Sequence, residues 1–209
     1  HSTIANVTKK IDGKDMDVQE RWMLGGLAAY GEKEVLAFYM DFVPVVVNGA
    51  THGCLVVKVR YSHDSGMTWS DPQTVINKGE ITRAAKLYYD KKVANENFAE
   101  FMQCLSWACF DSTGKPHFIW QDSRDGQAKL DDNYFNQWHV RHTWASTPGG
   151  ECVNSERVSR PVVCNRPPLD FICCSADSKY LYVTWTEAPK NKAGWAFSGE
   201  FWFGRKKFE

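Results

Sequence analysis

Three segments of the chain share one pattern of apolar and polar positions: a short apolar run, a polar turn, a second apolar run and then an acidic residue. Short apolar runs on both sides of a turn are typical of β-hairpins with buried strands. The turns contain Gly, Asp and Ser, which tight turns favour. The three segments are 27–41, 105–122 and 171–187. The pattern therefore predicts a β-hairpin that occurs three times.

A loop and a further apolar segment follow each hairpin, at about 54–62, 136–145 and 200–206. Repeats of about four strands at this spacing point to the blades of a β-propeller. We therefore expect an all-β chain with about three four-stranded antiparallel blades. Their approximate ranges are 21–80, 94–160 and 161–209.

The rest of the chain fits blades less well. Residues 1–20 are polar, and we expect them to form an N-terminal arm. Residues 79–103 connect two blades and are expected to hold an outer strand or a short helix. The segment 44–53 is apolar for a connection, which indicates an extra strand or a contact surface for a partner.

The first blade ends in a short motif, Ser62-His63-Asp64-Ser65-Gly66-Met67-Thr68-Trp69. An Asp carboxylate can accept hydrogen bonds from the backbone of its own turn, and Gly tolerates a positive φ. We expect Ser62, Asp64, Gly66 and Thr68 to build one tight turn. Trp69 is expected to return to the apolar layer as the next strand begins.

This Ser-x-Asp-x-Gly-x-Thr-Trp motif resembles the Asp box of sialidases and other bacterial-neuraminidase-repeat proteins. The resemblance implies that the motif caps the hairpin between the third and fourth strands of a blade, in a ring of six. A weaker copy at 146–153 keeps the Ser and Gly but has Pro148, Cys152 and Val153 at the other motif positions. Enzymes, lectins and receptors all carry the motif, so it indicates fold more than activity.

Three blades would fill about half of such a ring, and an open half-ring leaves unpaired edges and an apolar flank. Three explanations remain open. The chain is one piece of a larger protein, or a second copy or another chain completes the ring, or the hairpins belong to a different β fold. We favour the first two, because closure removes the edges.

The resemblance also implies a chemistry. Sialidases bind the substrate carboxylate with three arginines and use a Tyr–Glu nucleophile pair and an Asp acid/base. The family's early Arg-Ile-Pro motif is absent from this sequence, and no complete catalytic set is recognisable. Arg160-Pro161 and Arg166-Pro167 match it poorly, and Tyr180, Tyr182 and Glu187 contain a candidate Tyr–Glu pair whose tyrosines also suit packing.

The candidate ligand-binding residues are Asp122, Arg124, Asp125, Arg60 and Arg141. The first three follow the second strand of a blade, where a loop can meet a ligand. The alternative, which we favour, is an exposed ion pair that shapes the loop. Arg60 and Arg141 lie on third strands, and for them we favour a solvated strand face.

Charge and composition narrow the remaining classes. Lys plus Arg and Asp plus Glu both number 25, so the net charge gives no sign of a nucleic-acid partner. No apolar stretch is long enough for a membrane span. The six His form no ligand cluster, Asp131-Asp132-Asn133 reads as a turn rather than a calcium site, and we expect no metal or cofactor. Asn6 begins a glycosylation sequon, consistent with a secreted protein.

The seven cysteines are an odd number, which in a secreted protein leaves at least one thiol free or bonded to another chain. Cys104, Cys109 and Cys173 fall in apolar strand patterns, and we expect them to be small core residues.

Three functions remain in view. The first is a non-catalytic repeat-propeller segment for binding or assembly, with glycans as a candidate ligand. The second is part of a secreted exo-sialidase or related glycoside hydrolase. The third is a structural subunit of a larger assembly. A cleft that presents Arg60, Arg124 and Arg141 together would favour the enzyme.

Overall fold

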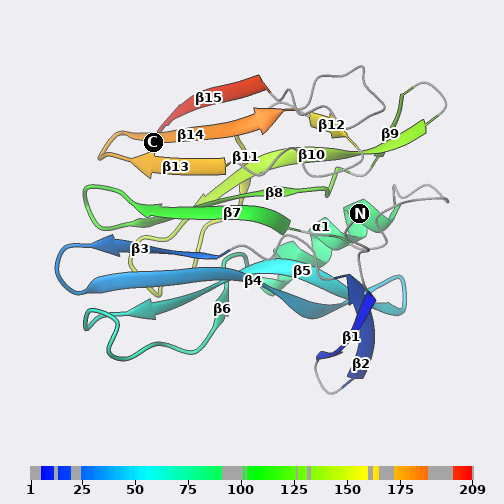
Figure 1. The fold of residues 1–209 in the computed structure, drawn as a ribbon, viewed down its shortest axis with the longest axis horizontal. Helices are drawn as coiled ribbons and strands as arrows, with labels where there is room; N and C mark the ends of the chain where they lie inside the picture. Colours follow the sequence, from blue (N-terminus) through cyan, green and yellow to red (C-terminus); the bar gives the residue numbers. More distant parts are fainter. Residues whose placement is uncertain are drawn as a thin grey trace.

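The described part of the protein is mostly β-strand, and its strands form three larger antiparallel sheets and one separate hairpin (Figure 1). The computed structural model describes residues 6–11, 14–19, 25–90, 101, 103–125, 127–130, 133–159, 162–164, 172–187 and 200–208. Side chains are described for 25–90, 101, 103–125, 138–159, 172–186 and 201–208. The expectation of an all-β chain with three antiparallel sheets is confirmed.

The first sheet is a meander in which each strand pairs with the next one along the chain. Its strands are β3 (Gly26–Tyr30), β4 (Glu34–Val47), β5 (Ala50–Ser62) and β6 (Gln73–Thr74). The apolar segment 44–53 is not an extra strand, because it consists of the end of β4, a turn and the start of β5 and so extends this hairpin. Asn48 and Gly49 close this hairpin with φ of 52° and 80°, a geometry that Asn-Gly favours.

The second sheet has the same meander plus two short strands beside the start of β10. Its main path is β7 (Gln103–Phe110), β8 (Pro116–Asp122), β10 (Asn133–Trp144) and β11 (Glu156–Arg157), and β9 (Gln127–Leu130) and β12 (Val162–Cys164) pair with β10. The weak copy of the motif forms the turn between β10 and β11, where Gly149 has a φ of 78°.

The third sheet has three strands, and a separate hairpin lies near the N-terminus. The third sheet contains β13 (Ile172–Ala176), β14 (Tyr180–Glu187) and β15 (Glu200–Lys207) in that order. The hairpin is formed by β1 (Asn6–Ile11) and β2 (Lys14–Gln19), within the predicted arm.

The three sheets are stacked, with the second between the other two (Figure 1). The first strand of the second sheet, β7, lies against β3 on one side and β13 on the other. First strands lie side by side in this way when blades surround an axis. The strand β8 shows the effect of the stacking, because every one of its residues is buried.

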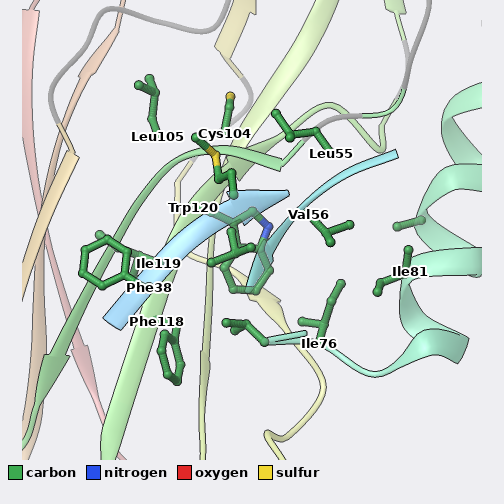
Figure 2. Packing of buried hydrophobic residues seen from close by; sticks show 14 of the residues in the cluster. Phe38, Leu55, Val56, Ile76, Ile81, Cys104, Leu105, Phe118, Ile119 and Trp120 are labelled. Atoms are coloured by element: carbon green, nitrogen blue, oxygen red, sulfur yellow. The ribbon is translucent and has the colours of Figure 1, made fainter. Parts of the chain in front are cut away.

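Buried apolar residues of all three sheets and of the single described helix, α1 (Lys78–Asp90), form one core (Figure 2). Leu55 and Val56 of β5, Ile119 and Trp120 of β8 and Ile81 of α1 belong to it. The predicted connection 79–103 thus begins with a helix. Asn77 caps it, since its Oδ1 accepts a 2.8 Å hydrogen bond from the Glu80 amide.

The segment 62–69, here named the Asp64 turn, folds around one carboxylate. Asp64 accepts hydrogen bonds from the Ser62 hydroxyl at 2.7 Å, the Thr68 amide at 2.8 Å and the Thr68 hydroxyl at 2.5 Å. The Thr68 hydroxyl and amide, followed by Ser62, hold the pKa of Asp64 down at about 2. Gly66 adopts a φ of 89°, which a side chain would strain. These four residues therefore form one tight turn around the Asp64 carboxylate.

Trp69 departs from its prediction. Its indole donates a 2.9 Å hydrogen bond to the Gly66 carbonyl and the residue stays 37% exposed, so it covers the turn instead of entering the core. Ser65 fastens the turn to the β3–β4 connection, where its amide donates to the Lys33 carbonyl at 2.9 Å. The Asp64 turn therefore joins two loops of the first sheet.

Replacement of the central carboxylate tests this role. Asp64→Ala removes the acceptor for three donors, and we expect the melting temperature to fall by roughly 2–4 °C for each kcal/mol lost in a chain of this size. Asp71→Ala, an exposed acid just beyond the turn, is the matched control and should leave the melting temperature unchanged. Equal melting temperatures for the two variants in calorimetry would contradict the role of Asp64.

Candidate functional site

The predicted ligand-binding residues fall into two groups. Asp122 ends β8, Arg124 and Asp125 follow it directly, and Arg141 lies opposite Trp120 in the pairing of β10 with β8. These four residues are brought together. Arg60 lies on β5 in the first sheet and is treated separately below.

Asp122 is the centre of the first group and is completely buried. The Arg124 guanidinium donates to its carboxylate from Nε, at 3.0 and 2.9 Å, and from Nη2 at 2.6 Å. Arg141 Nε donates to the same carboxylate at 3.2 Å, and the Trp120 indole at 3.0 Å. One carboxylate thus receives two guanidinium groups and an indole N–H.

The helix α1 contributes the second carboxylate. Arg124 Nη1 donates to Glu80 at 3.0 Å, and both the amide and the hydroxyl of Ser155 also donate to Glu80. Glu80 is itself 3% exposed. Arg124 therefore bridges the end of β8 to the first turn of α1, and Glu80 holds the segment before β11.

Asp125 and His139 complete the group, here named the Asp122 cluster (Glu80, Asp122, Arg124, Asp125, His139 and Arg141). Asp125 lies 2.6 Å from His139 Nε2 and 3.6 Å from Arg141 Nη2. Asp125 is the most exposed acid of the cluster, with 29% of its side chain accessible. The cluster thus reaches the surface at Asp125 and is buried at Asp122.

The protonation states follow from this geometry. Burial by itself would raise the pKa of Asp122, but the guanidinium groups of Arg124 and Arg141 outweigh it and leave that pKa below its ordinary value. Burial would lower the pKa of Arg124, yet Asp122 and Glu80 raise it overall. Both groups remain charged, and a buried pair of this kind is fastened in place by its own hydrogen bonds.

Two expectations are therefore corrected. Arg141 was expected on a solvated strand face, but its side chain is 11% exposed and pairs with Asp122. An ion pair between Asp122 and Arg124 was predicted, but as an exposed pair that shapes a turn. The pair is buried because β8 carries Asp122 into the space between the second sheet and α1. The partner Glu80 was missed, since it lies 44 residues away and only its place after the Asn77 cap marks it.

Arg60 does not join the Asp122 cluster. On β5 it alternates with Val59 and Tyr61, which lie on the face toward the second sheet, where Tyr61 lies beside Gly149 of the β10–β11 turn. Successive residues of a strand point to opposite faces, so Arg60 lies on the face away from the second sheet. The three arginines of the enzyme hypothesis therefore do not converge within the described residues.

A pocket of about 250 Å³ lies where the first sheet meets the turn between β10 and β11. Its lining residues are Val59, Tyr61, Gln73, Thr74, Val75, Asn77, Gly149, Gly150, Glu151 and Cys152. None of these residues is basic, so this pocket offers no guanidinium to an anionic sugar. Burial raises the pKa of the Cys152 thiol to about 12, which makes it a poor nucleophile.

Of the other residues considered in the sequence, some have a described position and some lie outside the described residues. The Tyr182 hydroxyl donates to Asp177 at 2.9 Å within the β13–β14 turn, and the Glu187 side chain is outside the described residues. Asn6 lies in β1, with its side chain also outside them. The residues 131–132, 160–161, 165–171 and 188–199 lie outside as well.

Two histidines on the other face of the second sheet form a pair that the sequence did not reveal. His117 Nδ1 and His142 Nε2 are 3.0 Å apart, and both rings are buried. Asp111 lies 3.5 Å from His117 at one end, and Glu156 lies 3.2 Å from His142 at the other. Lys206 of β15 pairs with Glu156, so this chain of groups links the second sheet to the third.

Burial is the main cause that keeps both histidines neutral. It lowers the pKa of His117 to about 4, with His142 as the next cause, and the pKa of His142 to about 3, with Lys206 as the next cause. The unfolded chain therefore takes up these protons near pH 6.5, well before the folded chain does.

The sequence was compared with protein families and with curated proteins. No protein-family model matches the sequence, and no curated protein matches it either. Among the described residues, no group of three or more His, Cys, Asp or Glu side chains is arranged to hold a metal ion. The one described helix is too short and too polar to cross a bilayer.

Removal of the bridging guanidinium tests whether the Asp122 cluster is an internal tie. Arg124→Met leaves Asp122 and Glu80 as buried carboxylates, and we expect the free energy of unfolding to fall by about 3–5 kcal/mol at neutral pH. The deficit should shrink as the pH falls and Asp122 becomes protonated.

The matched control is Arg83→Met, an exposed arginine on the same helix. Urea unfolding of both variants gives the comparison. A loss of less than about 1 kcal/mol for Arg124→Met, the range of a surface ion pair, would show that the cluster does not hold the fold.

The histidine pair predicts a pH-dependent stability. Because both folded pKa values lie below the unfolded value, stability is complete above about pH 6.5 and is lost as the pH falls toward 4 and 3. Each histidine should contribute a slope of about 1.4 kcal/mol per pH unit within this range.

The groups that face the pair are Asp111, Lys115, Glu156 and Lys206. In urea unfolding from pH 7 to 4, His117→Gln/His142→Gln should flatten the profile. The control His63→Gln replaces an exposed histidine and should retain the wild-type slope. An unchanged slope in the double variant would mean that other groups set the pH dependence.

Proposed function

We propose that this chain is a non-catalytic, sialidase-like repeat-propeller segment that acts in assembly, with a second copy of the chain as its partner. The support is architectural: three meandering sheets stacked through their first strands, with the Asp64 turn between the third and fourth strands of the first sheet. The residues considered for ligand binding engage one another in the Asp122 cluster or, like Arg60, lie apart from it.

The observation that carries the proposal is the outer face of the third sheet. Phe201 and Phe203 of β15 are 76% and 63% exposed on this face. Tyr182 lies beside them, with its ring centroid 6.2 Å from that of Phe203, and Arg205 lies 4.6 Å above the Tyr180 ring. This aromatic face (Tyr180, Tyr182, Phe201, Phe203 and Arg205) is the kind of exposed apolar patch that marks an interaction site.

The surface that we propose as the partner of the aromatic face lies at the other end of the stack, on the first sheet. The outer face of the first sheet also exposes an apolar residue, Leu27, at 71%, with Ala37 opposite it on β4. That face also carries Asp41, whose carboxylate pairs with Lys58 of β5 at 2.8 Å. Each copy thus presents one open sheet face at each end.

Two copies can cover all four of these faces. If the aromatic face of each copy packs on the Leu27 face of the other, the two contacts are related by a two-fold axis and no open sheet end remains. Rings that close in this way are finite assemblies, whereas a contact that does not close gives filaments. We extend the proposal to a secreted protein, which the Asn6 sequon suits.

Sedimentation velocity tests the proposal. From about 1 to 100 µM, a range that covers ordinary protein affinities, the 23.9 kDa chain should shift toward twice its mass. Phe201→Ser/Phe203→Ser should weaken the association at least tenfold, because two large apolar side chains leave the interface.

Met67→Ser is the matched control, since Met67 is 84% exposed on the Asp64 turn, away from both sheet ends. A wild-type chain that stays monomeric over the whole range would contradict assembly with a second copy. In that event, binding of a glycan array that depends on Phe201 and Phe203 would favour the glycan-recognition hypothesis.

A further inference from the structure

Two cysteines from different sheets lie in contact. Cys109 is on β7 of the second sheet and Cys174 is on β13 of the third, 65 residues further along the chain. Their Sγ atoms are 3.3 Å apart. A disulfide has a sulfur–sulfur bond of about 2.05 Å, so the sulfurs need to approach by only about 1.3 Å.

The strand geometry explains why the two sulfurs meet. Cys109 pairs with His117 and shares its face of the second sheet, the face toward the third sheet. Cys174 alternates with Cys173 on β13 and takes the buried face, while Cys173 is exposed. The expectation that Cys173 is a core residue is therefore wrong, and the strand alternation separates the roles of the two neighbouring cysteines.

We propose that Cys109 and Cys174 form an oxidation site, at which a disulfide fastens the second sheet to the third. This inference does not depend on association of the chain with a second copy. It concerns the seam inside one chain, between β7 and β13, and not the outer sheet faces.

The reaction is thiol–disulfide exchange with a low-molecular-weight disulfide. The Cys109 thiolate attacks one sulfur of the oxidant, which forms a mixed disulfide and releases one thiolate. The Cys174 thiolate then attacks the Cys109 sulfur and releases the second thiolate. Two protons leave the protein thiols and two electrons pass to the oxidant, which becomes two thiols.

The assignment of the two steps follows from access. Cys109 is partly exposed, so the oxidant can reach it, whereas Cys174 is buried and meets only its neighbour. Burial raises the pKa of Cys174 well above its ordinary value, with Cys109 as a further cause. Less of Cys174 is thiolate at neutral pH, so we expect the second step to become faster as the pH rises.

The test combines redox titration with peptide mapping. The reduced full chain is equilibrated with mixtures of glutathione and glutathione disulfide, quenched with an alkylating reagent and digested. We expect one cross-linked peptide pair that joins Cys109 to Cys174, with a loss of about 2 Da in the intact mass. The melting temperature should rise by roughly 5 °C or more, because the disulfide closes a long loop.

Three variants separate the neighbouring thiols. Cys173→Ala should keep the cross-link and the rise in melting temperature, whereas Cys109→Ala and Cys174→Ala should lose both. Mapping of the wild-type chain alone decides the pairing if a variant does not fold. Absence of a Cys109–Cys174 cross-link under the most oxidising mixture, or a cross-link to Cys173 in its place, overturns the proposal.

Discussion

Burial of the second sheet on both faces is the constraint on which the rest of this structure depends. A sheet with one wet face can leave its polar residues in water, but β8 is buried from Pro116 to Asp122. Its polar side chains must therefore find partners inside the protein. Asp122 does so on the face toward α1, and His117 does so on the face toward the third sheet. Gln121 is the exception, because its buried side-chain amide has no hydrogen-bond partner within the described residues.

These two internal groupings have different consequences. The Asp122 cluster contains full charges that compensate one another, so its value to the fold depends on every member being present. The histidine pair is neutral at pH 7, and it lowers the stability of the fold only when the pH falls below the pKa of histidine in the unfolded chain. The Asp122 cluster and the histidine pair both consist of residue types that also occur in binding sites. Residue type alone therefore suggested ligand binding at Asp122, Arg124, Asp125 and Arg141, whereas in the structure these side chains bind one another. Because these interior polar groups engage one another, the surfaces left to bind a partner are the outer faces of the first and third sheets.

Much of the fold could be predicted from the sequence because the relevant signals are local. The alternation of apolar residues and the Asp, Gly and Ser turns indicated the hairpins, and the spacing of Ser62, Asp64, Gly66 and Thr68 indicated a turn whose hydrogen bonds the structure shows. The strand β15 begins where the pattern placed it, at Glu200.

The missed features all require contacts between distant segments. Glu80 meets Arg124 only because α1 packs beside the second sheet, and Cys109 meets Cys174 only because β7 and β13 are neighbours. The sequence around each of these four residues does not indicate which distant segment it will contact. The exposure of Phe201 and Phe203 was equally hidden, since an alternating apolar strand looks the same whether its second face is covered or open.

Amide hydrogen exchange, followed by mass spectrometry in dilute and in concentrated protein, tests the account most directly. If the second sheet is sealed by the other two and the outer face of the third receives a partner, we expect slow exchange in Pro116–Asp122 at both concentrations. In Glu200–Lys207 we expect a protection that appears only in concentrated protein. Fast exchange in Pro116–Asp122, or exchange in Glu200–Lys207 that does not change with concentration, would contradict this account.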